Sequence, residues 1–295
     1  MTAQPDRDMI KVSLLGLGSM GQAAAKLLVA HAPLTVWNRT GSKSEALRRK
    51  GVDVASSADA AVRASPITIV SLLDNAAVRA VLSTCGASLA GRIVINLTNG
   101  IPAEARHIAE LVTDQGGAYL HGAVMATPPM LGSSGAMILF SGSEQAYSSA
   151  SKVLAALGNC AFLGTDPGQA PTLELGLLSI MYGLYGGFFH AAATLEAEGK
   201  PFDDLFRLAG PWIAGLAAAL PRLGDQITRR AYDEGTSSSL RMQMVGMDHY
   251  MKWSEAQGIR GSLMQPMRDL MTARTEAGYG SHGIASIYEL IRPRR

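Results

Sequence analysis

The sequence has very little cysteine and almost no net charge. Only two cysteines, Cys85 and Cys160, occur in 295 residues, so a disulfide-built scaffold is excluded. The formal net charge is +2, so there is no broad basic field of the kind that nucleic acid requires. The first nine residues are charged and contain no apolar run, so they lack the core of a signal peptide. These absences predict a cytoplasmic protein that binds no nucleic acid.

Long hydrophobic runs are also scarce, with one exception at residues 173–195, LELGLLSIMYGLYGGFFHAAATL. Its length would suit a membrane span. Against that, Glu174 lies near one end, His190 near the other, and no basic flank follows closely. A helix that is apolar all round is otherwise a helix buried all round. We therefore expect the central helix of a folded domain, with a membrane span as the alternative.

Short apolar runs alternate with helical patterns in the first half of the chain. The expected strands are 10–16, 34–38, 67–73, 92–98, 118–125 and 136–142, and the helical patterns between and after them are QAAAKLLVA, SKSEALRRK, AAVRAVLST and residues 144–157. Such alternation predicts a parallel sheet with crossover helices, a doubly wound α/β fold. The continuous apolar character of the runs fits strands that are covered on both faces.

The character of the sequence changes near residue 165. The cluster TDPGQAP at 165–171 is typical of a break between elements, and strand patterns almost disappear beyond it. The expected helices are 172–198, 203–219, 221–234, 238–257 and 262–278. The sequence thus predicts an α/β domain over 1–165 and an all-helical domain over 166–295.

A glycine-rich motif follows the first expected strand. Gly16, Gly18 and Gly21 form a G-x-G-x-x-G with Ser19 and Met20 between them, in the strand–turn–helix context that a dinucleotide-binding (Rossmann) fingerprint requires. The glycines allow a tight turn, close approach of the pyrophosphate and helix–strand packing. The helix N-terminus supplies free N–H groups for the anion. The alternative is an ordinary glycine-rich turn.

The residues after the second strand indicate which nucleotide is bound. Asn38, Arg39 and Thr40 stand there, with Lys43 close behind, and no carboxylate occurs between Pro33 and Ser44. An acidic residue here would accept hydrogen bonds from the ribose of NADH, whereas Arg39, helped by Lys43 and Thr40, would hold a 2′-phosphate. NADPH is therefore the expected cofactor, unless this is a solvated basic loop.

Leu72 and Leu73, at the end of the third expected strand, are expected to line the same nucleotide site.

Taken together, the motifs resemble those of imine reductases. The resemblance rests on GLGSMG, VWNRT, LTNGIP at 97–102 and GAVMATPPMLG at 122–132, and it extends from Ile10 to about Ile287. These enzymes belong to the superfamily of β-hydroxyacid and 6-phosphogluconate dehydrogenases. LTNGIP is similar to the reductive-aminase branch, whose members form and reduce an imine from a ketone and an amine.

The hydroxyacid members of that superfamily carry a catalytic lysine in a pattern close to G-x-G-x-x-x-K-x-x-N. Here Gly168 opens the pattern, Ala170 replaces the second glycine, and Glu174 stands where the lysine would be. Imine reductases usually have Asp or Tyr at that position, so Glu174 departs from both patterns. A lysine would repel a protonated iminium, whereas a carboxylate would stabilise it and could exchange a proton with it if burial raises its pKa.

The resemblance also implies roles for five other residues. Tyr182, eight positions after Glu174 and about 12 Å along the same helix, and Asn99 are expected in the active site with Glu174. Trp212, Met242 and Gln243 are expected to shape the substrate pocket. All of these residues except Gln243 have a structural alternative: an N-terminal helix residue for Glu174, core packing for Tyr182, Trp212 and Met242, and a turn for Asn99.

The sequence therefore predicts an NADPH-dependent imine reductase or reductive aminase that acts on an imine, or on a ketone plus an amine. The alternatives are an NADP-dependent β-hydroxyacid dehydrogenase, which the missing lysine disfavours, and a non-catalytic NADPH sensor. A single subunit could hardly cover the apolar helix, so a homodimer with intertwined helical domains is expected, as the resemblance also implies. The stereochemistry of the product stays open.

Overall fold

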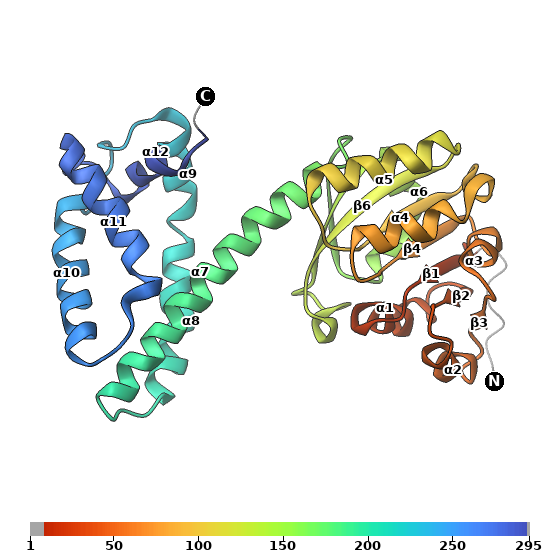
Figure 1. Ribbon diagram of the computed structural model, residues 1–295, viewed down its shortest axis with the longest axis horizontal. Coiled ribbons are helices and arrows are strands. Elements are labelled where there is room, and N and C mark those ends of the chain that lie inside the picture. Colours follow the sequence, from red (N-terminus) through yellow and green to blue (C-terminus); the bar gives the residue numbers. More distant parts are fainter. Residues whose placement is uncertain (1–8, 294–295) are drawn as a thin grey trace. The chain divides into compact units, whose positions relative to one another are not determined.

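The computed structural model describes residues 9–293 (Figure 1). The first eight residues, on which the expectation about a signal peptide rests, lie outside this range. The chain divides into two compact units, Met1–Ser179 and Ile180–Arg295. This division falls inside a long helix, α7 (Gln169–Ala197), whose first turns pack with the sheet. The division between the units lies further along the chain than the change in composition near residue 165.

The first unit is built on an eight-stranded sheet in the order β3-β2-β1-β4-β5-β6-β7-β8. Its strands are β1 (Val12–Leu15), β2 (Leu34–Trp37), β3 (Asp53–Val54), β4 (Ile67–Val70), β5 (Ile93–Asn96), β6 (Ala118–Met125), β7 (Met137–Gly142) and β8 (Asn159–Gly164), and its helices are α1 (Ser19–Leu28), α2 (Ser42–Arg48), α3 (Ala58–Ala64), α4 (Asn75–Ser83), α5 (Pro102–Asp114) and α6 (Glu144–Ala155). The order reverses between β1 and β4, which is the point where doubly wound sheets bind their ligands.

All six expected strands and the four expected helical patterns of this unit are confirmed. The short strand β3, the edge strand β8 and the helices α3 and α5 were not expected. One pairing also differs from a wholly parallel sheet, because β7 runs antiparallel to β6. The connection at 126–136 carries only a short 3₁₀ turn, Pro128–Met130, and a parallel return would need a longer crossover.

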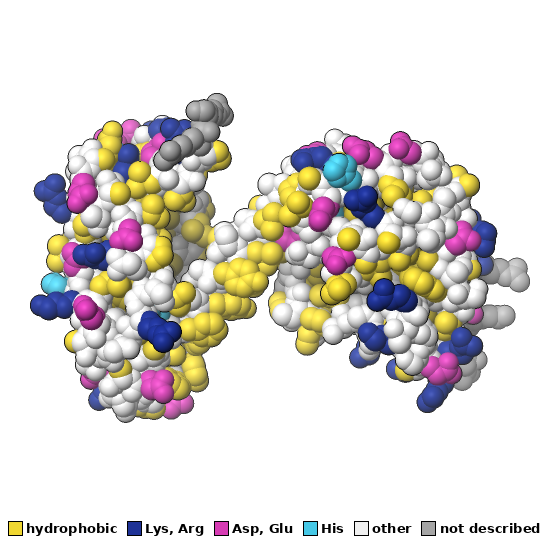
Figure 2. Space-filling view, viewed as in Figure 1, with side chains coloured by type: hydrophobic (Ala, Val, Ile, Leu, Met, Phe, Trp, Pro, Cys, Tyr) yellow, Lys and Arg dark blue, Asp and Glu magenta, His cyan; other side chains and the backbone are white. Residues whose placement is uncertain are grey.

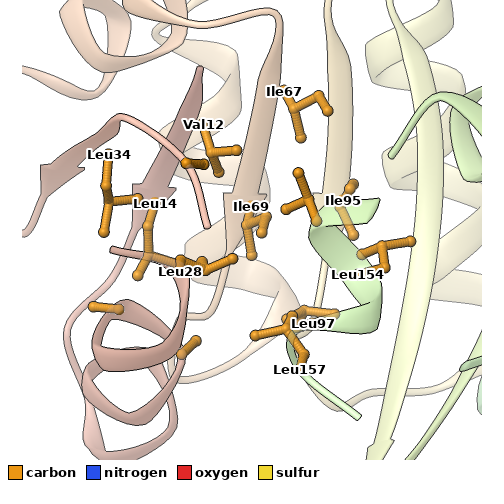
Figure 3. Packing of buried hydrophobic residues seen from close by; sticks show 14 of the residues in the cluster. Val12, Leu14, Leu28, Leu34, Ile67, Ile69, Ile95, Leu97, Leu154 and Leu157 are labelled. Carbon is orange, nitrogen blue, oxygen red and sulfur yellow. The ribbon is translucent and has the colours of Figure 1, made fainter. Parts of the chain in front are cut away.

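The helices cover both faces of the sheet and enclose two separate apolar cores. One core lies against α1, α2 and α6 and includes Val12, Leu14, Ile69 and Leu154 (Figure 3). The other lies against α3, α4 and α5, and takes Leu15, Val70 and Val94 from the same strands. Neighbouring strand residues point to opposite faces, and this is why runs without polar alternation are stable here as strands.

The second unit is helical. It contains the rest of α7 and the helices α8 (Asp203–Ala217), α9 (Leu220–Arg229), α10 (Leu240–Ala256), α11 (Gln265–Arg274) and α12 (Tyr288–Ile291). All but α12, which was not expected, lie near the predicted ranges. Its buried apolar cluster is small, with Leu240, Met271 and Ile287 at the centre.

The long apolar helix α7 is not buried within one chain, contrary to the prediction from its composition. Its most apolar 18-residue window has a mean hydropathy of 1.3, enough by length and composition to cross a membrane, yet only 6% of that window is buried. Hydrophobic side chains of α7 form a surface band in Figure 2, and Ile180, Tyr185 and Phe189 are among the exposed ones. The second unit thus leaves a large apolar surface uncovered.

Candidate active site

Apart from Glu174 on α7, the expected site residues of the first unit follow the carboxyl ends of neighbouring parallel strands. The glycine motif follows β1, Asn38 follows β2, Leu72 follows β4 and Asn99 follows β5. Because these strands are adjacent in the sheet, their loops meet at one edge. This edge is the crevice in which open α/β sheets bind nucleotides.

The glycine loop has no room for side chains at two of its three glycines. Gly16 has a φ of +104°, and a Cβ there would lie 2.1 Å from the carbonyl oxygen of Ser71. A Cβ on Gly21 would lie 2.1 Å from the carbonyl oxygen of Gly16. A Cβ on Gly18 would meet nothing within 4 Å, so this position leaves open space above the backbone. That openness is what close approach of a pyrophosphate requires.

Helix α1 presents an electropositive end to this space. Its N-cap, Gly18, has no side chain to cap it, and no acidic residue lies in the first turn. The N–H groups of that turn are thus free to bind an anion, and the helix dipole favours negative charge there.

Asn38 braces the loop after β2 against the glycine loop. Its Oδ1 accepts a hydrogen bond from the Leu17 N–H at 2.9 Å, and its Nδ2 donates to the Thr40 carbonyl at 2.9 Å. Arg39 and Lys43 are exposed beside it, and neither forms an ion pair with any residue in the range 9–293. Two cations are thus available to a phosphate.

These loops line a groove of about 420 Å³. Its lining includes all the residues predicted to bind the cofactor except Gly21, which packs behind the loop: Gly16, Gly18, Ser19, Met20, Asn38, Arg39, Thr40, Lys43, Leu72 and Leu73. A glycine-lined centre with cations at one end fits a dinucleotide whose ribose carries a 2′-phosphate.

Glu174 and Asn99, distant in sequence, meet at the same edge of the sheet. Asn99 Nδ2 donates a hydrogen bond of 2.8 Å to Glu174 Oε1. The side chain of Glu174 is buried, with 3% of it exposed, and its Oε2 is also buried and has no partner among the residues that the structure describes. The predicted pairing of a carboxylate with this asparagine in one site is therefore present in the geometry.

The start of α7 is anchored to the sheet, and this fixes Glu174. Ser141 Oγ on β7 donates to the Pro167 carbonyl at 3.0 Å and accepts from the Ala170 N–H at 2.9 Å. Arg106 on α5 binds both carboxylate oxygens of Asp166 at 2.8 Å. Ala170 is fully buried against Ala123 and Leu139.

The helix therefore begins at Gln169 rather than 172, and Glu174 lies beyond its first turn. The explanation of Glu174 as a residue favoured by the helix dipole loses its basis, because that effect fades within one turn.

Burial raises the pKa of the Glu174 carboxyl, and the hydrogen bond from Asn99 lowers it in part. A carboxyl with a raised pKa keeps its proton to a higher pH than a free carboxyl does, and a cation that arrives beside it favours the ionised form. Such a group can stabilise a bound cation and exchange a proton with it.

The other four predicted site residues belong to the second unit. Tyr182, Trp212 and Met242 are exposed, at 67%, 69% and 69%, so none is a core residue of a single chain. Gln243 is half-buried, and its Nε2 donates to the Ser238 carbonyl at 3.1 Å. These four residues lie in the second unit, whereas Glu174 lies in the first. Their roles in the active site stay predictions.

Sequence reasoning missed a set of polar residues beneath Asn99: the buried Asn75, Asn96 and Thr98 and the half-buried Glu104. One signal was available, since Asn96 ends an otherwise apolar strand, IVIN, and a buried amide requires partners. Their contacts are taken up below.

Two family models and several known proteins match the chain. Residues 11–164 match the NAD binding domain of 6-phosphogluconate dehydrogenase, and residues 166–293 match the NADPH-dependent reductive aminase-like C-terminal domain. An NADPH-dependent reductive aminase from Aspergillus oryzae is 34% identical over 95% of this chain and 97% of its own length.

Solved structures agree with these matches. A reductive aminase from Aspergillus terreus, in complex with NADPH4, cyclohexanone and allyl amine, is 40% identical with a TM-score of 0.90, over 96% of this chain and 100% of that chain. An imine reductase from Myxococcus stipitatus in complex with NADP+ is 29% identical with a TM-score of 0.88, again over 96% and 100%.

Proposed function

Because this chain belongs to the NADPH-dependent reductive aminase family, we propose that it reduces the C=N bond of an imine or iminium ion to an amine. The observation that carries this proposal is the buried carboxylate of Glu174, held by Asn99, at the position where alcohol-oxidising relatives are expected to carry lysine. An anion at this place suits a cationic electrophile, whereas a lysine would repel it.

The cofactor is NADPH, which supplies the hydride. Arg39 and Lys43 would bind the 2′-phosphate, Thr40 would add a hydroxyl, and the N-terminus of α1 would bind the pyrophosphate. Leu72 packs over Gly16, where a Cβ would lie 2.8 Å from its Cδ2. It thus closes the groove on the side of β4 and excludes water from that wall.

Glu174 would act on the nitrogen of the substrate. Its Oε1 is occupied by Asn99, whereas its buried Oε2 has no partner in residues 9–293 and is free to accept a hydrogen bond from an N–H⁺ group. Asn99 keeps a carbonyl oxygen that can accept from the same amine. Tyr182, Trp212, Met242 and Gln243 are proposed to complete the substrate pocket.

A second copy of the chain is the proposed cover for the apolar surface of the second unit. Residues of α7 and α8 line an apolar hollow of about 370 Å³, and Gly183, Gly187, Ala191 and Trp212 are among them. Small residues one helical turn apart allow another helix to approach closely. We propose a homodimer with intertwined helical domains, located in the cytoplasm, with a membrane as the alternative cover.

The first test follows NADPH oxidation at 340 nm in three parallel reactions: a cyclic imine, cyclohexanone with excess small amine, and, in reverse, 3-hydroxy acids with NADP⁺. The proposal expects turnover in the first reaction, and in the second if the enzyme also promotes imine formation. Turnover of the hydroxy acids alone would identify a β-hydroxyacid dehydrogenase. Tight NADPH binding without turnover across a broad panel of imines would identify a sensor.

The same assay tests Glu174 directly. Glu174→Ala should lower kcat about a hundredfold or more, the usual contribution of a positioned acid or base, with NADPH affinity nearly unchanged because Glu174 lies outside the nucleotide groove. Unchanged turnover in this variant would remove Glu174 from the mechanism.

A further inference from the structure

We propose that Thr98 is a positioning residue, which fixes the nucleotide loop at Leu72 and the substrate loop at Asn99 to each other through a buried chain of side-chain hydrogen bonds. The proposal rests on the function proposed above for these two loops. Thr98 itself does not line the nucleotide groove. It is buried, with 2% of its surface exposed.

Thr98 joins the two loops with both of its polar groups. Its hydroxyl oxygen accepts a hydrogen bond of 3.0 Å from the backbone N–H of Leu72, in the nucleotide groove. Its own N–H donates 3.0 Å to Asn96 Oδ1. The residue that follows is Asn99, which binds Glu174. A displacement of Thr98 would therefore move the wall of the cofactor groove and the partner of the catalytic carboxylate together.

The amide of Asn96 uses all its hydrogen-bonding groups to hold this arrangement. While Oδ1 accepts from Thr98, Nδ2 donates to Asn75 Oδ1 at 3.0 Å and to the Tyr119 hydroxyl at 3.1 Å. Asn96 is completely buried, so a lost partner would not be replaced by bulk water.

The directions of these hydrogen bonds follow from a carboxylate at one end of the chain. Glu104 can only accept, and its Oε2 lies 3.1 Å from Asn75 Nδ2. Asn75 must therefore turn its amide nitrogen to Glu104 and its oxygen to Asn96. Asn96 must then donate to Asn75, and its oxygen remains for Thr98, whose N–H can only donate. The chain thus has one self-consistent orientation.

The same residues restrain the backbone on the far side of Asn99. A Cβ on Gly100 would lie 1.9 Å from Asn75 Nδ2 and 2.6 Å from Glu104 Oε2, so the loop passes directly against this pair. The Ile101 N–H also donates to Glu104 Oε2 at 3.2 Å. Asn99 therefore lies between Thr98 and Ile101, whose N–H groups both donate to this network of side chains.

The network ends on a neutral histidine inside the sheet. The Tyr119 hydroxyl accepts from Asn96 and is therefore free to donate to His121 Nδ1, 3.1 Å away. Burial lowers the pKa of His121 to about 4, so the imidazole is neutral and can accept this hydrogen bond near pH 7. The network carries no buried charge at this end, which suits a rigid support.

The test compares Thr98→Val with Thr98→Ser. Valine has the shape of threonine but cannot accept from Leu72, and serine keeps the hydroxyl. For Thr98→Val we expect NADPH to bind about tenfold or more weakly, the effect of one lost buried hydrogen bond, and kcat with a cyclic imine to fall by a similar factor. Thr98→Ser should stay within about twofold to threefold of wild type, since its hydroxyl preserves that bond.

The pH profile separates positioning from loss of stability. Asn99 lowers the pKa of Glu174, so if Thr98→Val moves Asn99 away, the limb of the kcat profile that depends on Glu174 should shift to higher pH. A variant that was only less stable would lose melting temperature without this shift. NADPH binding, measured by quenching of fluorescence, needs no turnover. It thus tests the Leu72 contact even if wild type reduces no imine and the proposed function is wrong.

Glu104 offers a second pair of variants at the half-buried end of the network, where folding is less at risk. Glu104→Met removes the acceptor and should give the same pH shift with a smaller loss of kcat. Glu104→Gln can still accept through its amide oxygen and should behave like wild type. Thr98→Val with wild-type NADPH affinity and pH profile would overturn the proposal. So would equal losses in Thr98→Val and Thr98→Ser.

Discussion

The two units of this chain differ in how far their apolar side chains are buried. In the first, the sheet and its helices enclose two cores in which residues such as Leu14, Ile69 and Phe140 are wholly buried. In the second, α8 has no buried residue, and Trp212 and Phe206 are 69% and 61% exposed. Burial of apolar surface stabilises a protein by roughly 25 cal/mol per Å². An isolated subunit lacks this stabilisation wherever the side chains of the second unit stay exposed.

This contrast separates two parts of the proposed function. The first unit contains all the residues predicted to bind the dinucleotide, and it places Glu174 against Asn99. The second unit supplies the remaining predicted pocket residues on surfaces that another subunit would cover. Binding of the cofactor should therefore depend on residues of the first unit alone, and assembly on residues of the second.

The largest expected effect is on assembly. Charged substitutions on the exposed face of the second unit, Phe189→Lys with Phe206→Lys, should convert a dimer into monomers, because each places a charge in an apolar interface. Size-exclusion chromatography with light scattering would measure this. Turnover should fall with the dimer if the partner completes the pocket.

The matched control is Val29→Lys, an exposed apolar position at the end of α1 in the first unit. It should leave the dimer intact. A wild-type protein that is monomeric and soluble without detergent would contradict the dimer, and one that needs detergent would favour the membrane alternative.

A smaller effect is expected on the cofactor. Arg39→Ala should raise the KM for NADPH about tenfold to a hundredfold, the usual value of a charge-assisted hydrogen bond, and change the KM for NADH little, since NADH has no 2′-phosphate. Steady-state kinetics with each nucleotide would measure the two values. Arg48→Ala, on the exposed side of α2 and outside the groove, is the control. An equal rise in KM for NADPH and NADH would show that Arg39 does not bind the 2′-phosphate.

The smallest effect is on the stability of the first unit. Burial raises the folded-state pKa of Glu174, so the stability that this group contributes at low pH is lost as the pH rises through that value. Glu174→Gln cannot ionise, so its melting temperature relative to wild type should rise between acidic and alkaline pH. Glu196→Gln, on an exposed part of the same helix, should show no such trend. A constant difference for Glu174→Gln would contradict a buried carboxyl.

Much of the first unit could be predicted from the sequence, because short apolar runs and the glycine motif are local patterns. The strands β3 and β8 could not be predicted in the same way. The first has only two residues, and the second, Asn159–Gly164, contains glycine and asparagine and is held as an edge by its pairing with β7. The antiparallel direction of β7 depends on the loop at 126–136 rather than on any residue within the strand.

The residues of the candidate site could be predicted from the sequence, but the contacts between them could not. Glu174 and Asn99 could each be identified from motifs, but the hydrogen bond between them depends on where α7 begins. That start is set by Ser141 and Arg106, which are far away in sequence. The composition of α7 predicted that one subunit could hardly cover it, and most of the helix is indeed exposed. What covers it could not be predicted, because an apolar helix has the same composition whether a partner chain or a membrane covers it.

The central claim is that an anionic Glu174 stabilises a cationic C=N group during hydride transfer. The most direct measurement is the single-turnover rate with an N-methylated cyclic iminium, a permanent cation that needs no proton, in wild type and Glu174→Gln. We predict a rate about a hundredfold lower in Glu174→Gln, as for the loss of one electrostatic contact to the transition state. Equal rates in the two proteins would contradict the claim.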